Sequence, residues 1–162
     1  MPRACLASTE KNAISTAIEN EISQSLERSD ISIDATSGLS FDSEYQYATF
    51  KECVYTKNGD GSYAELIRMD SERVVVGIAS EVTCEVVCDF EFYAYDSIDK
   101  ENIKLGNNSY TITHVYDTEV LVTLVGPFAD GLSEVDVEEV EVLQTPDSVD
   151  FGDISIDWGE QE

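Results

Sequence analysis

From Asp30 onward, apolar and polar residues alternate along the chain, and this period of two constrains the fold more than any other feature. The alternation is clearest in the second half of the stretch 73–95. One side of that stretch is apolar: Val82, Cys84, Val86, Cys88, Phe90 and Phe92. The other side carries mostly acids and threonine: Glu81, Thr83, Glu85, Asp89 and Glu91. Because successive side chains of a strand point to opposite faces, the pattern predicts antiparallel strands with one buried and one solvated face.

Residues 8–28 follow a different period, which is typical of a helix. Large apolar residues recur there at every fourth position: Ile14, Ile18, Ile22 and Leu26. Ser8 or Thr9 can cap the start of this helix, and its narrow apolar stripe suits packing against a sheet. We therefore predict an α+β fold, mostly antiparallel β. One N-terminal amphipathic helix would pack on a twisted, bulged antiparallel sheet or sandwich.

A turn signal separates two of the predicted strands. Asn58-Gly59 is followed directly by Asp60-Gly61, and both dipeptides are typical of β-hairpins. We expect a type I′ turn at Asn58-Gly59 that pairs strand 44–56 with strand 62–69. A valine at Gly59 is then expected to disrupt the hairpin, because a β-branched residue avoids positive φ.

Two further positions predict bulges. The stretch 73–95 is longer than an ordinary strand, so Gly77 or Ser80 is expected to mark a bulge or bend. In the last predicted strand, 135–143, Glu138-Glu139 interrupts the phase of the valines on either side, which also predicts a β-bulge.

The segment after Leu143 is poor in large apolar residues, and Pro146, Gly152 and Gly159 punctuate it. We therefore expect one helix-plus-β domain over residues 1–143. An acidic, flexible tail is expected over 144–162.

The charge of the chain restricts its partners. It has 34 Asp and Glu against 9 Lys and Arg, a formal net charge of −25. Such a chain repels nucleic-acid phosphates and anionic lipid headgroups. Direct binding to nucleic acid or to a membrane surface is therefore disfavoured, whereas a protein partner with a basic surface is favoured.

The acids are distributed unevenly. No Lys or Arg follows Lys104, so the last part of the chain is where we expect a partner to bind. The partner-binding residues expected there are Glu134, Asp136, Glu138, Glu139, Glu141, Asp150, Asp153 and Asp157.

Motifs of known chemistry are not found in the sequence. His114 lies in a strand pattern without a nucleophile elbow, and neither type of Gly-rich phosphate loop occurs. Cys84 and Cys88 lie four residues apart on a strand, about 13 Å, which is too far for a disulfide between them. We expect buried free thiols, no catalytic residue, no structural metal and no cofactor.

A weak cation site stays open at one turn, where Asp96, Asp99 and Glu101 offer oxygen ligands without the spacing of an EF-hand loop. No apolar run has the length of a membrane span or of a signal-peptide core, so we expect a cytoplasmic protein.

The segment Asp89–Leu105, followed by Thr111–Thr113 and Val120–Leu124, resembles part of a known family. It is similar to the acidic β-rich region that follows the nuclease domain in some bacterial PIN-like ribonuclease proteins of toxin and defence systems. In that region an alternating strand ends in an Asp-Ser-x-Asp-Lys-Glu turn, which is present here within Tyr95–Glu101. The resemblance covers residues 30–143. It implies an accessory module without the nuclease domain, so no catalytic residue carries over.

Two functional hypotheses follow. The first is a non-catalytic acidic β module that binds or regulates a protein partner, namely a basic or nucleic-acid-processing protein of a bacterial defence or toxin system. The second is a nucleic-acid mimic of the anti-restriction or anti-CRISPR type, encoded by a phage or mobile element. A mimic requires carboxylates about 7 Å apart along a convex ridge, since that spacing matches the phosphates of one DNA strand.

Overall fold

The structure is a computed structural model that describes residues 8–126 and 136–156, with side chains from residue 13 onward. In chain order the elements are α1 (Ser8–Arg28), β1 (Ser32–Thr36), β2 (Ser40–Tyr55), β3 (Glu65–Met69), β4 (Arg73–Asp96), β5 (Glu101–Val125), β6 (Asp136–Val142) and β7 (Ser148–Asp153). The predicted helix therefore has the observed bounds. One helix packs on a mostly antiparallel sheet, which confirms the α+β prediction.

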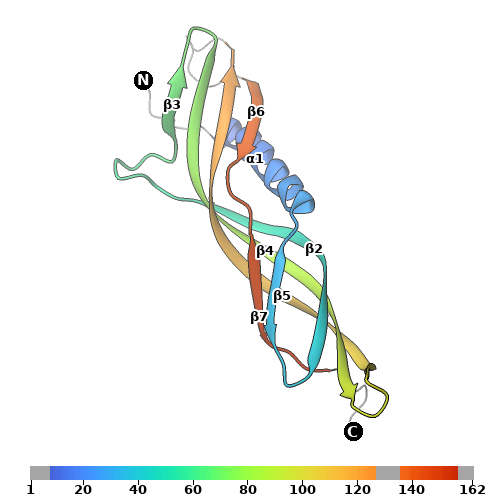
Figure 1. The fold of residues 1–162 in the computed structure, drawn as a ribbon. Coiled ribbons are helices and arrows are strands. Elements are labelled where there is room, and N and C mark those ends of the chain that lie inside the picture. The colour runs from blue at the N-terminus through green and yellow to red at the C-terminus, as the bar shows by residue number, and fades with distance from the viewer. Residues whose placement is uncertain (1–7, 127–135, 157–162) are drawn as a thin grey trace.

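The strands form two sheets (Figure 1). The larger sheet is antiparallel and has the order β2-β4-β5-β6, with β3 as a fifth strand that also pairs with β4. The smaller sheet is a parallel pair of β1 and β7. The two ends of the described chain meet in this pair, because β1 directly follows the helix and β7 is the last strand.

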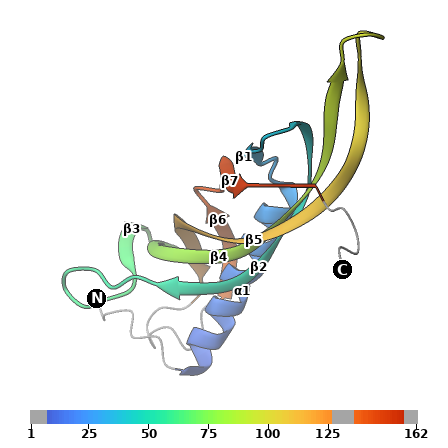
Figure 2. The same ribbon diagram turned by 90° about the horizontal axis from the view of Figure 1, so that it is seen from below.

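The long hairpin of β4 and β5 forms the centre of the larger sheet. The two strands pair from Arg73 opposite Val125 to Asp96 opposite Glu101, with one register shift near the turn. Figure 2 shows this pair curving through the fold and extending past the other strands at its turn. At that turn the Asp96 carboxylate accepts a hydrogen bond from the Ile98 backbone N–H at 2.9 Å.

The core lies on one face of the large sheet, which we call the inner face. The alternating apolar residues of β4 are fully buried there, as the sequence pattern predicts. Ile18 and Ile22 of α1 belong to the same core cluster. Phe151 of β7 contacts the ring of Phe90 edge-on, with the ring centroids 5.6 Å apart. The helix and the β1–β7 pair therefore cover the same inner face, and the opposite face, called the outer face below, carries the other side chains of β2, β4 and β5.

The expected tail is part of the packed fold over its described portion, 144–156. β7 forms there, and four side chains enter the core cluster: Val149, Phe151, Ile154 and Ile156. The expected division at residue 143 is therefore not what the structure shows. The apolar residues in this segment are few, but they alternate as in a strand and fill a gap on the inner face. Residues 157–162 lie outside the described residues.

The predicted hairpin at Asn58-Gly59 is wrong. β2 and β3 do not pair with each other, since both pair with the same edge of β4, one after the other. The turn between them is closed by a backbone hydrogen bond from Asn58 N–H to the Ser62 carbonyl at 2.7 Å. Gly61, not Gly59, has the positive φ, at 88°.

The two bulge predictions have different outcomes. In β6, Glu139 lies opposite Thr123 and Val137 lies opposite Leu124, so Glu138 is the extra residue and the predicted bulge is confirmed. At Gly77 and Ser80 the β4–β5 register is regular, so no bulge against β5 occurs there, and the alternative of a bend stays a prediction.

A pair of substitutions tests the turn between β2 and β3. Gly61→Val should destabilise the fold by about 1–2 kcal/mol, because an L side chain disfavours the left-handed backbone region. The matched Gly59→Val change should have a much smaller effect, since Gly59 lacks a positive φ and has open space where a Cβ would lie. Thermal unfolding followed by circular dichroism measures both. Equal losses of stability at the two glycines would contradict the observed turn.

Candidate functional site

The outer face carries two neighbouring rows of carboxylates near the turn of the β4–β5 hairpin. In one row Asp42 of β2 lies opposite Glu91 of β4, and in the next row Glu44 lies opposite Asp89. Neighbouring strands lie about 5 Å apart, and alternate residues of one strand about 7 Å apart. Four carboxylates of two strands, which are separated by more than 40 positions in the sequence, therefore share one small area.

An open hollow of about 280 Å³ lies at these rows. We call it the acidic hollow. Its lining residues come from β2, β4 and β5: Asp42, Ser43, Glu44, Asp89, Phe90, Glu91, Asn107, Asn108 and Ser109. All of the charged residues among them are acids.

Hydrogen bonds hold carboxylates of the acidic hollow in place. The Tyr93 hydroxyl donates to Glu91 Oε1 at 2.6 Å, and Lys104 Nζ lies 3.3 Å from Glu91 Oε2. These two contacts lower the pKa of Glu91, the tyrosine bond being the larger cause. The Ser109 hydroxyl donates to Asp89 Oδ1. Among the described residues, no Lys or Arg forms an ion pair with Asp42, Glu44 or Asp89.

The Tyr93 phenol reports on the charge of the hollow. Its hydrogen bond to the Glu91 carboxylate raises its pKa to about 12, because the bond favours the protonated phenol. We expect Glu91→Gln to move the pKa of Tyr93 back toward 10, since the amide carries no charge. The measurement is the ultraviolet absorbance of tyrosinate during an alkaline titration, with Tyr93→Phe identifying the Tyr93 contribution. An unchanged titration in Glu91→Gln would show that this bond does not control the phenol.

The structure separates the residues that were predicted to bind a partner. Asp136, Glu138, Glu139 and Glu141 lie on β6 in the larger sheet, whereas Asp150 and Asp153 lie on β7 in the smaller one. All six are exposed. Glu134 and Asp157 lie outside the described residues.

Two of these six carboxylates have local structural partners. Glu138 forms a two-pronged ion pair with Arg73, with Nε–Oε1 at 2.7 Å and Nη2–Oε2 at 3.1 Å. This pair lowers the pKa of Glu138. The Asp150 carboxylate accepts a hydrogen bond from Gly152 N–H at 2.8 Å. The segment after Lys104 has no basic residue of its own, but Arg73 of β4 pairs with one of its acids, so the absence of basic residues along the chain does not leave its acidic surface without a cation.

A second open hollow lies where the chain leaves β6, beside Thr118, Glu119 and Gln144. Gln144 N–H donates to Thr118 Oγ1 at 3.0 Å, and Glu119 N–H donates to the Gln144 side-chain oxygen at 2.8 Å. These bonds continue the β5–β6 ladder past its last residue pair. Thr118, Glu119 and Gln144 are therefore engaged in holding the strand end.

The reactive side chains do not assemble into a site within the described part of the chain. His114 stacks on the ring of Tyr116, with the centroids 6.2 Å apart. Burial raises the pKa of the Cys84 and Cys88 thiols to about 11, so both remain thiols at neutral pH. No three His, Cys, Asp or Glu side chains of residues 8–126 and 136–156 are grouped so that they could hold a metal ion, including those at the Asp96 turn.

Comparison with family models, with curated proteins and with solved structures finds no match to this chain. In the part of the chain that the structure describes, the one helix is too polar to cross a membrane. The acidic hollow was not predicted as a site, although the alternating pattern placed Asp89 and Glu91 on the solvated face. The contribution of Asp42 and Glu44 depends on the β2–β4 register, which no local pattern encodes.

Proposed function

We propose that this chain is a non-catalytic module that binds a protein partner with a basic surface, through the outer face around the acidic hollow. The observation that carries the proposal is the convergence of four carboxylates from β2 and β4 beside a single paired lysine, Lys104. Opposite charge on a partner would raise the rate of encounter and fix its orientation. A nucleic-acid-processing protein fits this chemistry, because its binding surface for phosphates is basic.

The geometry gives less support to nucleic-acid mimicry. On the outer side of β4 the acids are Glu81, Glu85, Asp89 and Glu91, with Thr83 and Val87 between them. Two of the three intervals are therefore four residues, or about 13 Å, and only the interval from Asp89 to Glu91, inside the acidic hollow, has the 7 Å that matches phosphates. We propose the protein-binding function on this ground.

The experiment is affinity capture from the organism that encodes the chain, at low salt, followed by identification of the captured protein. We expect a basic protein that is released at moderate salt, since the attraction between exposed charges is screened. The test variant neutralises the hollow by Asp42→Asn, Glu44→Gln, Asp89→Asn and Glu91→Gln. The control variant removes the same charge from β6 and β7 by Asp136→Asn, Glu139→Gln, Glu141→Gln and Asp153→Asn.

The two variants separate a local site from net charge. Loss of the partner in the hollow variant with retention in the control supports the proposal. Equal weakening in both would show that only total charge matters. Loss in the control alone would instead assign binding to the residues predicted from the sequence.

A further inference from the structure

β3 is an edge strand whose side chains differ from those of the other edges. It pairs with β4 on one side and with no other described strand. All five of its residues are exposed, among them three large apolar side chains: Leu66 at 47%, Ile67 at 48% and Met69 at 57%. An exposed apolar edge strand can pair with a strand of another chain, because the backbone N–H and C=O groups along its free side lack partners.

The edges of the larger sheet at β2 and β6 are protected, whereas the part of β5 before Val120 is a further edge, since it pairs with β4 alone among the described strands. β2 has two register shifts against β4, one on either side of Ala48, and Lys51 lies at the second of them. β6 has the bulge at Glu138 and exposes acids along its length. Bulges and charges of this kind prevent pairing between edges. β3 is therefore a less protected edge than β2 or β6.

The charges of β3 are self-complementary. A register shift places Glu65 opposite Gly77 and Arg68 opposite Val75, two β4 residues with the same orientation. Glu65 and Arg68 therefore lie on the same face of the sheet, near opposite ends of β3. When two copies pair in an antiparallel manner about a two-fold axis, the Glu65 end of each strand lies beside the Arg68 end of the other.

The side chain of Ile67 lies on that same face. A Cβ at Gly77 would be 3.3 Å from Ile67 Cδ1, so the isoleucine side chain lies over Gly77 of β4 on the outer side. In a two-fold pair the two Ile67 side chains come from adjacent strands. The exposed part of each Ile67 side chain would lie between the two charged ends.

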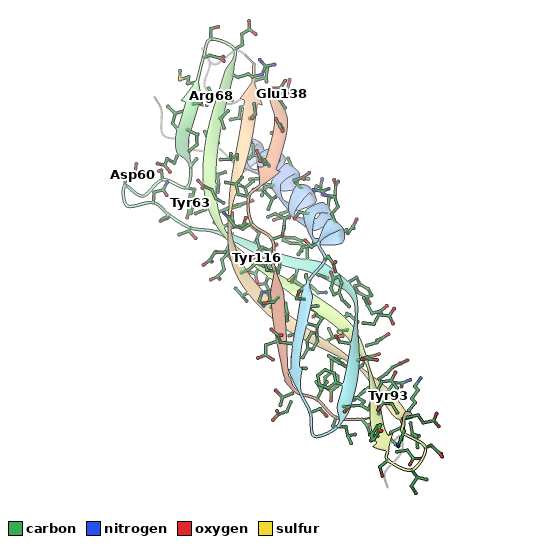
Figure 3. The ribbon with its side chains drawn as sticks, viewed as in Figure 1. Asp60, Tyr63, Arg68, Tyr93, Tyr116 and Glu138 are labelled. Carbon is green, nitrogen blue, oxygen red and sulfur yellow. The ribbon has the colours of Figure 1, made fainter. Side chains whose placement is uncertain are left out.

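We infer that β3 is a pairing edge for a second copy of this chain, which would join two five-stranded sheets into one. A second copy is favoured over a foreign strand because Glu65 and Arg68 neutralise their counterparts. Elsewhere two copies would oppose acidic surfaces, since the chain carries a net charge of −25. Figure 3 shows Arg68 at the margin of the sheet, far from the acidic end marked by Tyr93. One short strand pair buries a small area, so the association is expected to be weak.

The test is sedimentation equilibrium of the purified chain between about 10 μM and 1 mM, a range suited to weak dimers. We expect reversible dimers, and Ile67→Lys should raise the dissociation constant by about tenfold or more. The control is Ile98→Lys, the same substitution at the 88% exposed turn of the β4–β5 hairpin, which should leave the dissociation constant unchanged. Circular dichroism verifies that both variants fold.

A charge swap tests the orientation. Arg68→Glu alone and Glu65→Arg alone should each weaken the dimer by about tenfold, because like charges then lie together on both sides of the axis. An equimolar mixture of the two variants should regain the affinity of the original chain, since each acid again lies beside an arginine. A chain that stays monomeric up to 1 mM, dimers indifferent to Ile67→Lys, or a mixture that does not recover would each overturn the inference.

Discussion

Phe151→Ala should lower the free energy of unfolding by about 3–5 kcal/mol, the usual cost of removing a buried aromatic ring. Phe151 is 8% exposed, and its ring contacts that of Phe90 in the interior. Phe90 in turn contacts Phe41 and Tyr110 edge-on, so the truncation opens a cavity beside a cluster of rings. Chemical denaturation followed by tyrosine fluorescence measures the loss.

The matched control for Phe151 is Asp153→Ala, on the same strand. Asp153 is exposed, so its replacement should change stability by less than about 0.5 kcal/mol. A loss of less than about 1 kcal/mol in Phe151→Ala would mean that β7 does not hold the core together in solution. The expected division at residue 143 would then be correct after all.

The sequence predicted those elements whose signal is local. The helix from Ser8 to Arg28 follows from its own apolar period of four, and the buried side of β4 follows from its own period of two. The β6 bulge follows from two adjacent acids. The hairpin at Asn58-Gly59 failed for a different reason. The turn signal is real, since the chain does turn there, but a turn does not determine which strand lies beside which. Both β2 and β3 pair with β4, which is a longer strand than either of them.

The role of β7 was missed because its apolar residues are few and Gly152 interrupts them. A strand pairing with β1, more than 100 positions earlier, has no local signature. The same limit applies to the acidic hollow. Its β4 acids were visible as a solvated face, whereas Asp42 and Glu44 join them only through pairing between strands. Counting charges along the chain pointed instead to its last third, where Arg73 from β4 neutralises Glu138.

The attachment of α1 depends on one narrow stripe, so Ile22→Ala should lower the free energy of unfolding by about 2–5 kcal/mol. Ile22 is fully buried, and the stripe contributes four long apolar side chains to the core cluster. A helix of this length gains most of its stability from packing, so the loss falls on the whole fold. We expect a single unfolding transition in which helical and sheet signals of circular dichroism are lost together.

Gln24→Ala provides the control for Ile22, because Gln24 lies on the exposed side of the same helix. Its replacement should change stability by no more than about 0.5 kcal/mol. If the helical signal of Ile22→Ala is lost at a lower temperature than the sheet signal, the helix detaches by itself and the sheet is stable without it. A joint transition means that the sheet is not stable without the helix. Removing the helix would expose to water the buried valines on the inner face of β4.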